Sequence, residues 1–324
     1  MSAGPAYLSE EDVHRRLDYD GCIAAMREAM TNLSKDAREQ PLRQITQLGS
    51  RRMFGLMPGL LPQSRDFGAK LVSVFPDPAS PSRSAHRGVV ALFDGENGEV
   101  VCLADGAAVT HIRTGCTSAV ATDALAKPEA ESLALFGCGA QAQSHLHAIT
   151  RIRTIRRVGI WSRRREPAEA LAEEARSRFG VEAKAWTDAA ALAGESDIIC
   201  TVTGATEPIL LGEWVRPGTH VNAVGSSFAG PREVDDSLVV ASRYFVDYRR
   251  SAMAAAAEFL HARDAGLISD DHIAGEIGEV VAGTVAGRRS HDDITLFKSL
   301  GHIAQDLAAV RYALSATSKM DVSR

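Results

Sequence analysis

The sequence predicts an α/β protein in which an α+β domain precedes a doubly wound parallel sheet, and three observations lead to this prediction. The apolar run Leu133–Phe136 leads into a glycine-spaced turn and a helix start. From residue 132 to 247, apolar runs of strand length alternate with helical or alanine-rich segments. Residues 42–105 instead contain strand-like runs joined by turns, as expected for a separate domain.

Composition limits the class of protein. The chain of 324 residues is long enough for about two domains, and its 45% hydrophobic and 24% charged residues are ordinary for a globular protein. A net charge of −5 offers no basic surface for nucleic acid, and five scattered cysteines without a C-x-x-C pair predict reduced thiols and no metal cluster. No apolar run reaches the roughly 18 residues of a membrane helix, and the polar start lacks a signal-peptide core. We therefore expect a cytoplasmic protein without a nucleic-acid or membrane partner.

The first domain is predicted to open with two packing helices, capped by Ser9 and Asp20. Alternating apolar residues then predict strands, the last two of which flank a hairpin-type turn at 94–98. A helix over 107–126 follows and ends where Pro128 forbids continuation. The predicted strands cover residues 43–48, 52–57, 68–75, 88–93 and 100–103.

The second domain is predicted to contain six strands in a βαβ rhythm, which is enough for a complete dinucleotide-binding domain. Helical patterns at 270–286 and 299–316 complete the chain. The six predicted strands cover residues 132–136, 157–161, 181–185, 197–202, 219–224 and 243–247.

The segment Gly137-Cys-Gly-Ala-Gln-Ala142 has the G-x-G-x-x-A spacing of a Rossmann-type dinucleotide site. Gly137 allows the tight turn, Gly139 lets the backbone approach a pyrophosphate, and small Ala142 lets the helix pack closely on the strand. Many such strings are ordinary turns, but here the next strand-like run follows at the distance a βαβ unit needs. The segment predicts an NAD(P) cofactor.

The residues after the second strand of this domain predict which cofactor is preferred. NAD sites usually end this strand with an acidic residue that accepts from the ribose 2′-hydroxyl. Here Ser162, Arg163 and Arg164 occupy that place, and the first acidic residue is Glu166. Because these groups can donate to a 2′-phosphate, we expect NADP to be preferred, with NAD possible. The alternative is a solvated basic helix start.

Five segments together resemble the ornithine cyclodeaminase/mu-crystallin family: Thr110-His-Ile-Arg-Thr114, Gly137–Gln141, Val221-Asn-Ala-Val-Gly225, Glu276-Ile-Gly-Glu279 and Thr295–Gly301. The resemblance implies a substrate-binding and dimerisation domain at 1–118, completed by a C-terminal helix at 302–324, and an NAD(P)-binding Rossmann domain at 119–301. It also implies a homodimer, and the apolar runs 53–61 and 71–75 would leave a large exposed patch on an isolated domain.

The resemblance also implies which residues bind the substrate. Arg43 and Lys70 contact it, and Arg113 reaches its carboxylate and the cofactor, which makes Lys70 and Arg113 the catalytic candidates. An arginine fork gives a carboxylate two parallel charge-assisted hydrogen bonds and so orients its α-carbon. The other substrate-binding candidates are His86, Ser227, Lys298 and Leu300. The cofactor-binding candidates are Thr114, Gly137, Gly139, Ala140, Gln141, Ser162, Arg163, Arg164, Thr203, Val224, Gly225, Ser226 and Ser299. The hydroxyl residues could instead be turn or cap residues, and a lone histidine is usually structural.

One departure from the family pattern narrows the expected reaction. In cyclodeaminases a catalytic aspartate follows the Val-Gly of the nicotinamide strand, and that position here is Ser227, which cannot act as a carboxylate base. We therefore expect an NAD(P)H-dependent reductase of a small imino acid, such as Δ1-pyrroline-2-carboxylate or Δ1-piperideine-2-carboxylate. The alternatives are alanine or another amino-acid dehydrogenase, an open-chain imine reductase, an ornithine cyclodeaminase, and a cofactor-binding protein of the crystallin type without turnover.

Overall fold

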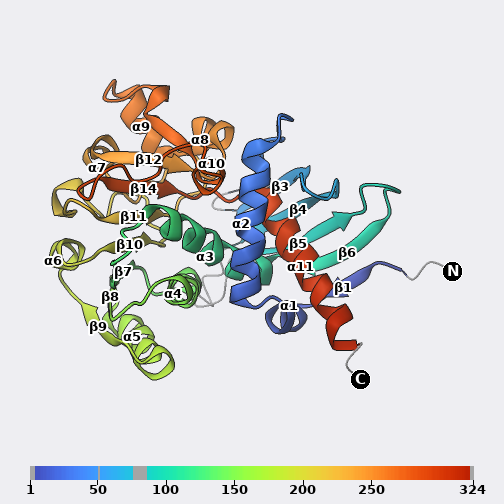
Figure 1. Cartoon of the computed structure of the whole chain (residues 1–324), viewed down its shortest axis with the longest axis horizontal. Helices are drawn as coiled ribbons and strands as arrows, with labels where there is room; N and C mark the ends of the chain where they lie inside the picture. The colour runs from blue at the N-terminus through green and yellow to red at the C-terminus, as the bar shows by residue number, and fades with distance from the viewer. Residues whose placement is uncertain (1–3, 50–51, 76–85, 322–324) are drawn as a thin grey trace. The chain divides into compact units, whose positions relative to one another are not determined.

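The computed structural model describes residues 4–49, 52–75 and 86–321. The chain divides into two compact units, residues 1–113 with 302–324 (unit 1) and residues 114–301 (unit 2). The division falls inside helix α3 (Gly106–Leu125), between Arg113 and Thr114, whereas the sequence suggested a boundary after residue 118. Figure 1 labels most of the elements of both units.

Unit 1 is built on a six-stranded sheet with the order β1-β6-β5-β4-β3-β2. β1 pairs with β6 in parallel and the other neighbours pair in antiparallel fashion. Helix α11 packs on β3, β4 and β5 and lies beside α2 (Figure 1). The strands are β1 (Ala6–Leu8), β2 (Gln44–Gly49), β3 (Arg52–Leu60), β4 (Phe67–Val74), β5 (His86–Phe93) and β6 (Val100–Asp105), and the helices are α1 (Glu10–Arg16), α2 (Tyr19–Lys35) and α11 (Ile303–Asp321). The predicted strands are confirmed to within a few residues, and β1 is an addition.

The two N-terminal helices begin at side-chain caps. Ser9 and Asp12 form a capping box at the start of α1, as the sequence indicated for Ser9. The prediction that Asp20 caps the second helix is wrong, because Asp18 accepts from the amide of Gly21 and the helix already begins at Tyr19. From the sequence alone, either aspartate could cap the second helix. Because α1 already ends at Arg16, the second helix can begin at Tyr19 with Asp18 as its cap.

The two faces of the unit 1 sheet differ. Met57, Lys70 and Val90 lie in register on β3, β4 and β5, so their side chains share a face. The same face carries Gly59 and Gly68, where an added Cβ would collide with Ile303 and Leu307 of α11. This is the face that α11 covers. The other face carries the partly exposed side chains of Phe54, Leu56, Leu60, Phe67, Leu71 and Phe93, which we call the open face.

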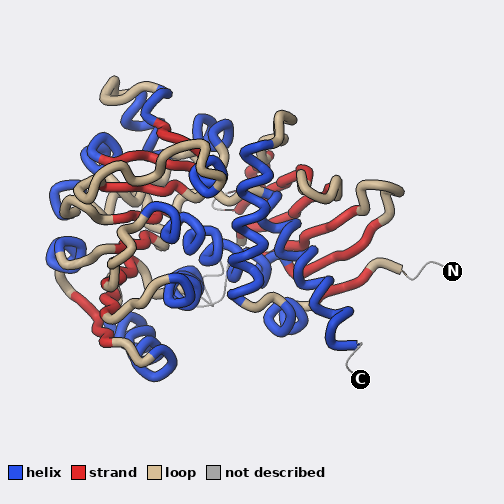
Figure 2. Tube along the Cα trace, in the orientation of Figure 1, coloured by secondary structure: helices blue, strands red, loops and turns tan. Residues whose placement is uncertain are grey.

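Unit 2 is an eight-stranded, fully parallel sheet with the order β13-β12-β14-β11-β10-β7-β8-β9, wound with helices. Figure 2 shows its strands in red with helices on either side of them. Its strands are β7 (Ser132–Phe136), β8 (Arg157–Trp161), β9 (Glu182–Trp186), β10 (Ile198–Thr201), β11 (His220–Ala223), β12 (Ser242–Val246), β13 (Ile273–Glu276) and β14 (Ile294–Lys298). Its helices after α3 are α4 (Ala140–Ile152), α5 (Arg165–Phe179), α6 (Ala189–Gly194), η1 (Gly212–Trp214), α7 (Asp236–Ala241), α8 (Arg249–Ala255), α9 (Ala257–Asp264), η2 (Asp270–His272) and α10 (Ile277–Val281).

The end of the chain departs from the sequence-based prediction. The helix predicted over 270–286 is wrong, because that segment contains η2, strand β13 and only the short helix α10. β14 was not predicted as a strand, although it lies between β11 and β12 inside the sheet. Both strands have only four or five residues, too few for a periodic pattern to separate them from a helix. The C-terminal helix begins at Ile303 rather than at residue 299.

Both faces of the unit 2 sheet are buried, as a doubly wound sheet requires. Alternate residues of β7 divide between two apolar cores, Leu133 and Leu135 in one and Ala134 and Phe136 in the other. The first core includes residues of α4 and α5, and the second includes residues of α6 to α9. None of the helices in the described part of the chain is long and apolar enough to cross a membrane.

The strand order sets the position of a ligand site. β8 and β9 follow β7 on one side, whereas β10 and β11 lie on its other side, so the direction of winding reverses between β7 and β10. In open parallel sheets, ligands bind outside the carboxyl ends of the strands at such a reversal.

Candidate functional site

A buried cluster of charges lies under α11 in unit 1. Lys70 of β4 donates from Nζ to Oδ1 of Asp306 at 3.1 Å and also to the hydroxyl of Thr110. Arg113 of α3 donates from Nε to the same Asp306 oxygen at 3.0 Å and from Nη1 to Oε1 of Gln305 at 2.5 Å. Lys70 and Arg113 are each 4% exposed, and Asp306 is fully buried. The structure therefore brings together Lys70 and Arg113, which the resemblance implied as substrate residues.

Positive charge exceeds negative charge in this cluster. Burial, together with the charges of Arg113 and Arg43 and against the opposing charge of Asp306, lowers the pKa of Lys70 from 10.5 to about 8. Burial disfavours ionisation of Asp306, but Arg113 and Lys70 hold its pKa below the usual value. Burial and Arg43 lower the pKa of His302 to about 3, so this side chain is neutral near pH 7. Two buried cations that share one carboxylate, with the half-buried Arg43 nearby, are suited to binding an anion such as a carboxylate.

The remaining substrate candidate of unit 1 with a described side chain is Arg43. It is half-buried in the loop before β2, close enough to influence the pKa of Lys70 and of His302. His86 is the first residue of β5, and its side chain lies outside the described residues.

The glycine turn of unit 2 has the geometry that a pyrophosphate cradle requires. Gly137 has a φ of 127°, and a Cβ there would lie 2.9 Å from the carbonyl oxygen of Val202. Gly139 precedes α4 as its N-cap without any side-chain cap, and a Cβ there would meet no protein atom within 4 Å. Only glycine fits at 137, while the space beside Gly139 leaves room for a phosphate at the helix N-terminus. Ala140 and Gln141 form the first turn of α4, so these residues fit a dinucleotide.

Thr114 and the basic segment after β8 also belong to unit 2. Thr114 is 7% exposed in the middle of α3. The hydroxyl of Ser162 accepts from the Sγ of Cys138 at 3.2 Å and from the amide of Arg164 at 3.3 Å, which joins this segment to the glycine turn. Arg163 and Arg164 are exposed, and neither guanidinium forms a salt bridge within the described part of the chain. These two side chains are available to an anion from solution.

The other candidates of unit 2 gather at the carboxyl ends of three neighbouring strands. Thr203 follows β10, residues 224–227 follow β11, and Lys298 ends β14 before Ser299 and Leu300. Ser226 is buried, and its hydroxyl donates to the carbonyl oxygen of Pro231. The amide of Ser299 donates to the carbonyl oxygen of Ala223 at 3.0 Å, which ties β14 to β11 at this edge.

Lys298 does not point into open space. It is fully buried, and its Nζ lies 3.1 Å and 3.0 Å from the two carboxylate oxygens of Glu258 in α9. The side chain of Asp247 accepts from the amides of Leu300 and Gly301 at 2.8 Å and 2.6 Å, so the backbone after β14 is held as well.

The sequence analysis did not identify the buried carboxylates that hold the candidate residues in either unit. Asp306 and Gln305 belong to the apolar run Ile303–Ala309 and were taken only as part of a packing helix. The signal that could have found Asp306 is the expected convergence of Arg43, Lys70 and Arg113, because buried cations need a counter-charge. No feature of the sequence pointed to Glu233, Asp247 or Glu258 in this way.

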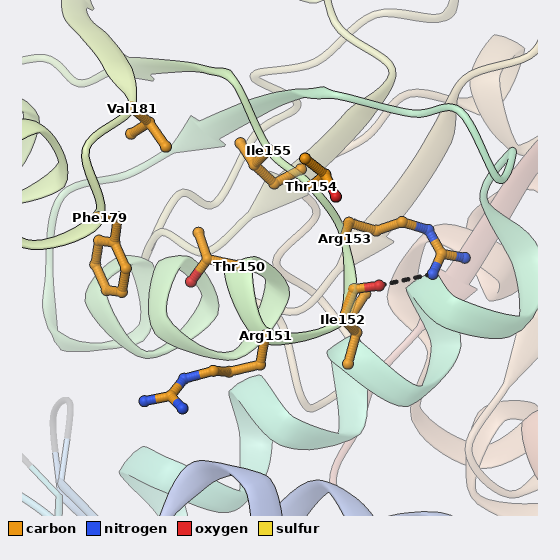
Figure 3. A pocket seen from close by; sticks show the side chains of 8 residues that line it. All are labelled: Thr150, Arg151, Ile152, Arg153, Thr154, Ile155, Phe179 and Val181. Carbon is orange, nitrogen blue, oxygen red and sulfur yellow. Dashed lines mark hydrogen bonds between the residues drawn. The ribbon is translucent and has the colours of Figure 1, made fainter.

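A surface pocket of about 450 Å³ lies elsewhere in unit 2 (Figure 3). It is formed at the end of α4 and before β8 and β9, where the side chains of Thr150, Ile155, Phe179 and Val181 line it. Arg153 points away to Asp123, with Nη1 at 2.5 Å from Oδ1. Because the pocket lies at the amino ends of the strands, opposite to the edge where such sheets bind ligands, we assign it no role.

The chain is similar to known proteins along nearly its whole length. The sequence model of the ornithine cyclodeaminase/mu-crystallin family matches residues 5–319. The chain belongs to this family. It is 35% identical to the ketimine reductase mu-crystallin of Mus musculus over 324 residues, which cover 98% of this chain and 99% of the mouse protein.

Two solved structures are similar to this chain in fold. The Δ1-pyrroline-2-carboxylate reductase of Thermococcus litoralis, in complex with NADH and L-proline, has a TM-score of 0.93 and 29% identity, with 98% of each chain covered. An archaeal alanine dehydrogenase dimer with bound NAD has a TM-score of 0.91 and 26% identity, covering 98% of this chain and 97% of its own.

Proposed function

We propose that this protein is an NAD(P)H-dependent reductase that converts a small cyclic imino acid to the L-amino acid. Δ1-Pyrroline-2-carboxylate and Δ1-piperideine-2-carboxylate are the proposed substrates. The observation that carries the proposal is the buried pairing of Lys70 and Arg113 through Asp306, which supplies an anion-binding group beside a lysine of near-neutral pKa. The mu-crystallin and pyrroline-2-carboxylate reductase relatives support it.

The residues of unit 1 have distinct roles in this reaction. Arg113 and Arg43 bind the substrate carboxylate, because guanidinium groups match carboxylate geometry. Lys70 has a pKa of about 8, so it carries a proton at neutral pH and can pass it from Nζ to the imine nitrogen. Asp306 orients both cations, since both donate to its Oδ1.

The residues of unit 2 bind the cofactor. The turn with Gly137, Gly139, Ala140 and Gln141 binds the pyrophosphate, helped by Thr114, and the residues after β10, β11 and β14 surround the nicotinamide. The bound cofactor supplies the hydride that adds to the C=N carbon. Arg163 and Arg164, with Ser162, bind a 2′-phosphate, so we propose that NADPH is preferred to NADH. Exclusion of water around the C=N bond is the main further requirement.

The partners of three buried carboxylates in unit 2 argue against a cyclodeaminase reaction. Ser227 stands where the family's cyclodeaminases have an aspartate, and it cannot serve as a base. Glu233 and Asp247 accept from backbone amides, and Glu258 is paired with Lys298. None of these three carboxylates is placed to substitute for the missing aspartate.

The test is a screen of cyclic and open-chain 2-imino acids with NADPH, followed at the nicotinamide absorbance band. We expect rapid oxidation of NADPH with a cyclic ketimine and no proline from ornithine. Arg113→Ala should lower kcat/KM by about 30- to 1000-fold, because a lost bidentate contact to a charged group is worth roughly 2–4 kcal/mol. Robust proline formation from ornithine, or unchanged ketimine reduction by Arg113→Ala, would contradict the proposal.

The similarity to alanine dehydrogenase favours one second candidate, an amino-acid dehydrogenase. Such an enzyme releases free ammonia when it oxidises its product, whereas oxidation of proline to a cyclic imine releases none. An ammonia assay during the reverse reaction separates the two. A protein that binds NADPH but turns over no imino or amino acid would instead be a binding protein.

A further inference from the structure

Glu233 links the ends of two strands at the ligand-binding edge of unit 2. One carboxylate oxygen, Oε1, accepts from the amide of Thr203 at 2.6 Å and from its hydroxyl at 2.7 Å. The other, Oε2, accepts from the amide of Gly225 at 2.6 Å. Thr203 follows β10 and Gly225 follows β11, so a single side chain holds both strand ends.

The surrounding residues keep Glu233 in this position. It is fully buried, and its carbonyl oxygen accepts from the amides of Ile209 and Leu210 at 2.8 Å and 3.1 Å. Its own amide donates to Oε1 of Glu258 at 3.4 Å, and Glu258 is held in turn by Lys298. The side chain thus bonds on one side to the strand ends, and its backbone is anchored on the other.

The glycine at 225 is explained by this contact. A Cβ there would lie 2.4 Å from Cδ of Glu233 and 2.2 Å from the carbonyl oxygen of Thr203. No other residue fits while the carboxylate stays where it is. The close approach of both Glu233 and the Thr203 backbone therefore requires glycine at this position, whatever the cofactor requires.

The position of these strand ends in the sheet connects the Glu233 carboxylate with the proposed cofactor site. The winding of the sheet reverses between β7 and β10, and the glycine turn follows β7. A dinucleotide that crosses such a reversal puts its adenosine half toward β8 and its nicotinamide half toward β10 and β11. Thr203 and Gly225 belong to the nicotinamide half of the proposed site.

We propose that Glu233 is a positioning residue that fixes the backbone beneath the nicotinamide ring by holding the ends of β10 and β11 together. The proposal rests on the proposed binding of NAD(P)H. Glu233 acts through the amides of Thr203 and Gly225 and touches neither substrate nor the transferred hydride. Its loss affects binding of the nicotinamide half and leaves binding of the adenosine half unchanged.

The unit offers a matched control at the opposite edge of the same sheet. Asp197 accepts through Oδ2 from the amides of Glu131 and Ser132, both at 3.1 Å, and from the Ser132 hydroxyl at 2.7 Å. It therefore joins the amino ends of β7 and β10 as Glu233 joins the carboxyl ends of β10 and β11. A purely structural role predicts similar behaviour for both carboxylates.

The experiment compares E233Q with D197N and the wild-type protein. Glutamine has one accepting oxygen, so in E233Q only one of the two strand ends stays bound. We expect the Kd for NADPH, measured by nicotinamide fluorescence, to rise about ten-fold or more in E233Q. The Kd for 2′-phospho-ADP-ribose, which lacks nicotinamide, should change by less than about two-fold. D197N should lower the melting temperature and leave the ratio of the two Kd values unchanged.

Equal weakening of both ligands in E233Q, or no weakening of either, would overturn the assignment of Glu233. If E233Q does not fold, E233D is measured in its place, because the shorter carboxylate cannot reach both amides and the same outcomes apply. A wild-type protein that binds neither NADPH nor NADH would refute the proposed function itself. If the wild type binds NADPH but reduces no imino acid, the proposed reaction fails while the test of Glu233 remains valid.

Discussion

Oδ1 of Asp306 lies 3.1 Å from Nζ of Lys70, although 236 positions separate the two residues in the sequence. The same oxygen also accepts from Arg113 at 3.0 Å. The last helix of the chain thus provides the counter-charge for two cations from β4 and α3. The reactivity of Lys70 depends on this arrangement, and it leads to the first two predictions.

Reduction should depend on the protonated form of Lys70. The pKa of Lys70 is lowered to about 8, chiefly by burial, so the cation that delivers a proton is present below that pH and is lost above it. We expect kcat/KM for the imino acid to fall as pH rises through about 8. In Lys70→Arg the side chain stays charged, so this decline should disappear even if the rate is lower. If Lys70→Arg shows the same decline of kcat/KM at the same pH, the decline belongs to a group of the substrate instead.

Replacing Asp306 with Asn should move the same decline to lower pH. The charge of Asp306 raises the pKa of Lys70, so its removal lets burial and Arg113 lower that pKa further. Arg113 also loses its partner, and we expect kcat/KM to drop by about 10- to 100-fold. Asp66→Asn is the control, because Asp66 is a buried carboxylate of unit 1 that pairs with Arg311 at 3.4 Å, outside the cluster. If the two variants show the same pH profile, Asp306 has no special influence on Lys70.

Arg163 and Arg164 should decide the choice of cofactor. Both side chains are exposed at the start of α5, where a 2′-phosphate would follow β8. Replacing either with Ala should lower the ratio of kcat/KM for NADPH to that for NADH by about ten-fold, because a charge-assisted contact to phosphate is lost. Arg178→Ala, at the other end of the same helix, should leave the ratio unchanged. Equal kcat/KM values for the two cofactors in the wild type would refute the preference for NADPH.

We predict a homodimer formed through the open face of the unit 1 sheet. Phe54, Phe67 and Leu71 are each more than a third exposed on this face, and Phe67 stacks on Phe93 at 5.1 Å. An apolar surface of this kind normally marks an interface. Light scattering at micromolar concentration should give a dimer for the wild type and a monomer for Leu71→Asp. Leu267→Asp, at an exposed leucine of unit 2, should remain dimeric.

His220 should make the fold sensitive to mild acid. Burial, assisted by the charge of Arg288, lowers its pKa from 6.5 to about 3, and it bonds Thr295 at 3.0 Å. Below pH 6.5 the unfolded chain binds a proton that the folded chain does not. The free energy of unfolding therefore decreases as the pH is lowered toward about 3. One proton corresponds to about 1.4 kcal/mol per pH unit, which gives a loss of about 2 kcal/mol between pH 7 and 5. Urea unfolding of His220→Gln should show a smaller loss over this interval, and parallel curves would exclude the histidine as the cause.

The sequence alone determined the local parts of the nucleotide domain. The run Leu133–Phe136, the turn at Gly137 and Gly139, and the start of α4 are short-range features, because strand alternation and the backbone freedom of glycine depend only on neighbouring residues. The same reasoning predicted the strands of unit 1, and the family resemblance implied Lys70 and Arg113 as substrate residues.

Only the tertiary structure decided the parts that depend on residues far apart in the chain. Ile273–Glu276 becomes a strand because it pairs with β12, and Ile294–Lys298 becomes one because it fits between β11 and β12. Asp306 is one polar residue of an apolar helix until α11 packs over Lys70, and Glu233 is an ordinary loop residue until β10 and β11 end beside it. Hydrogen bonds and charges act over a few ångströms in space, and that separation is set by packing rather than by position in the sequence.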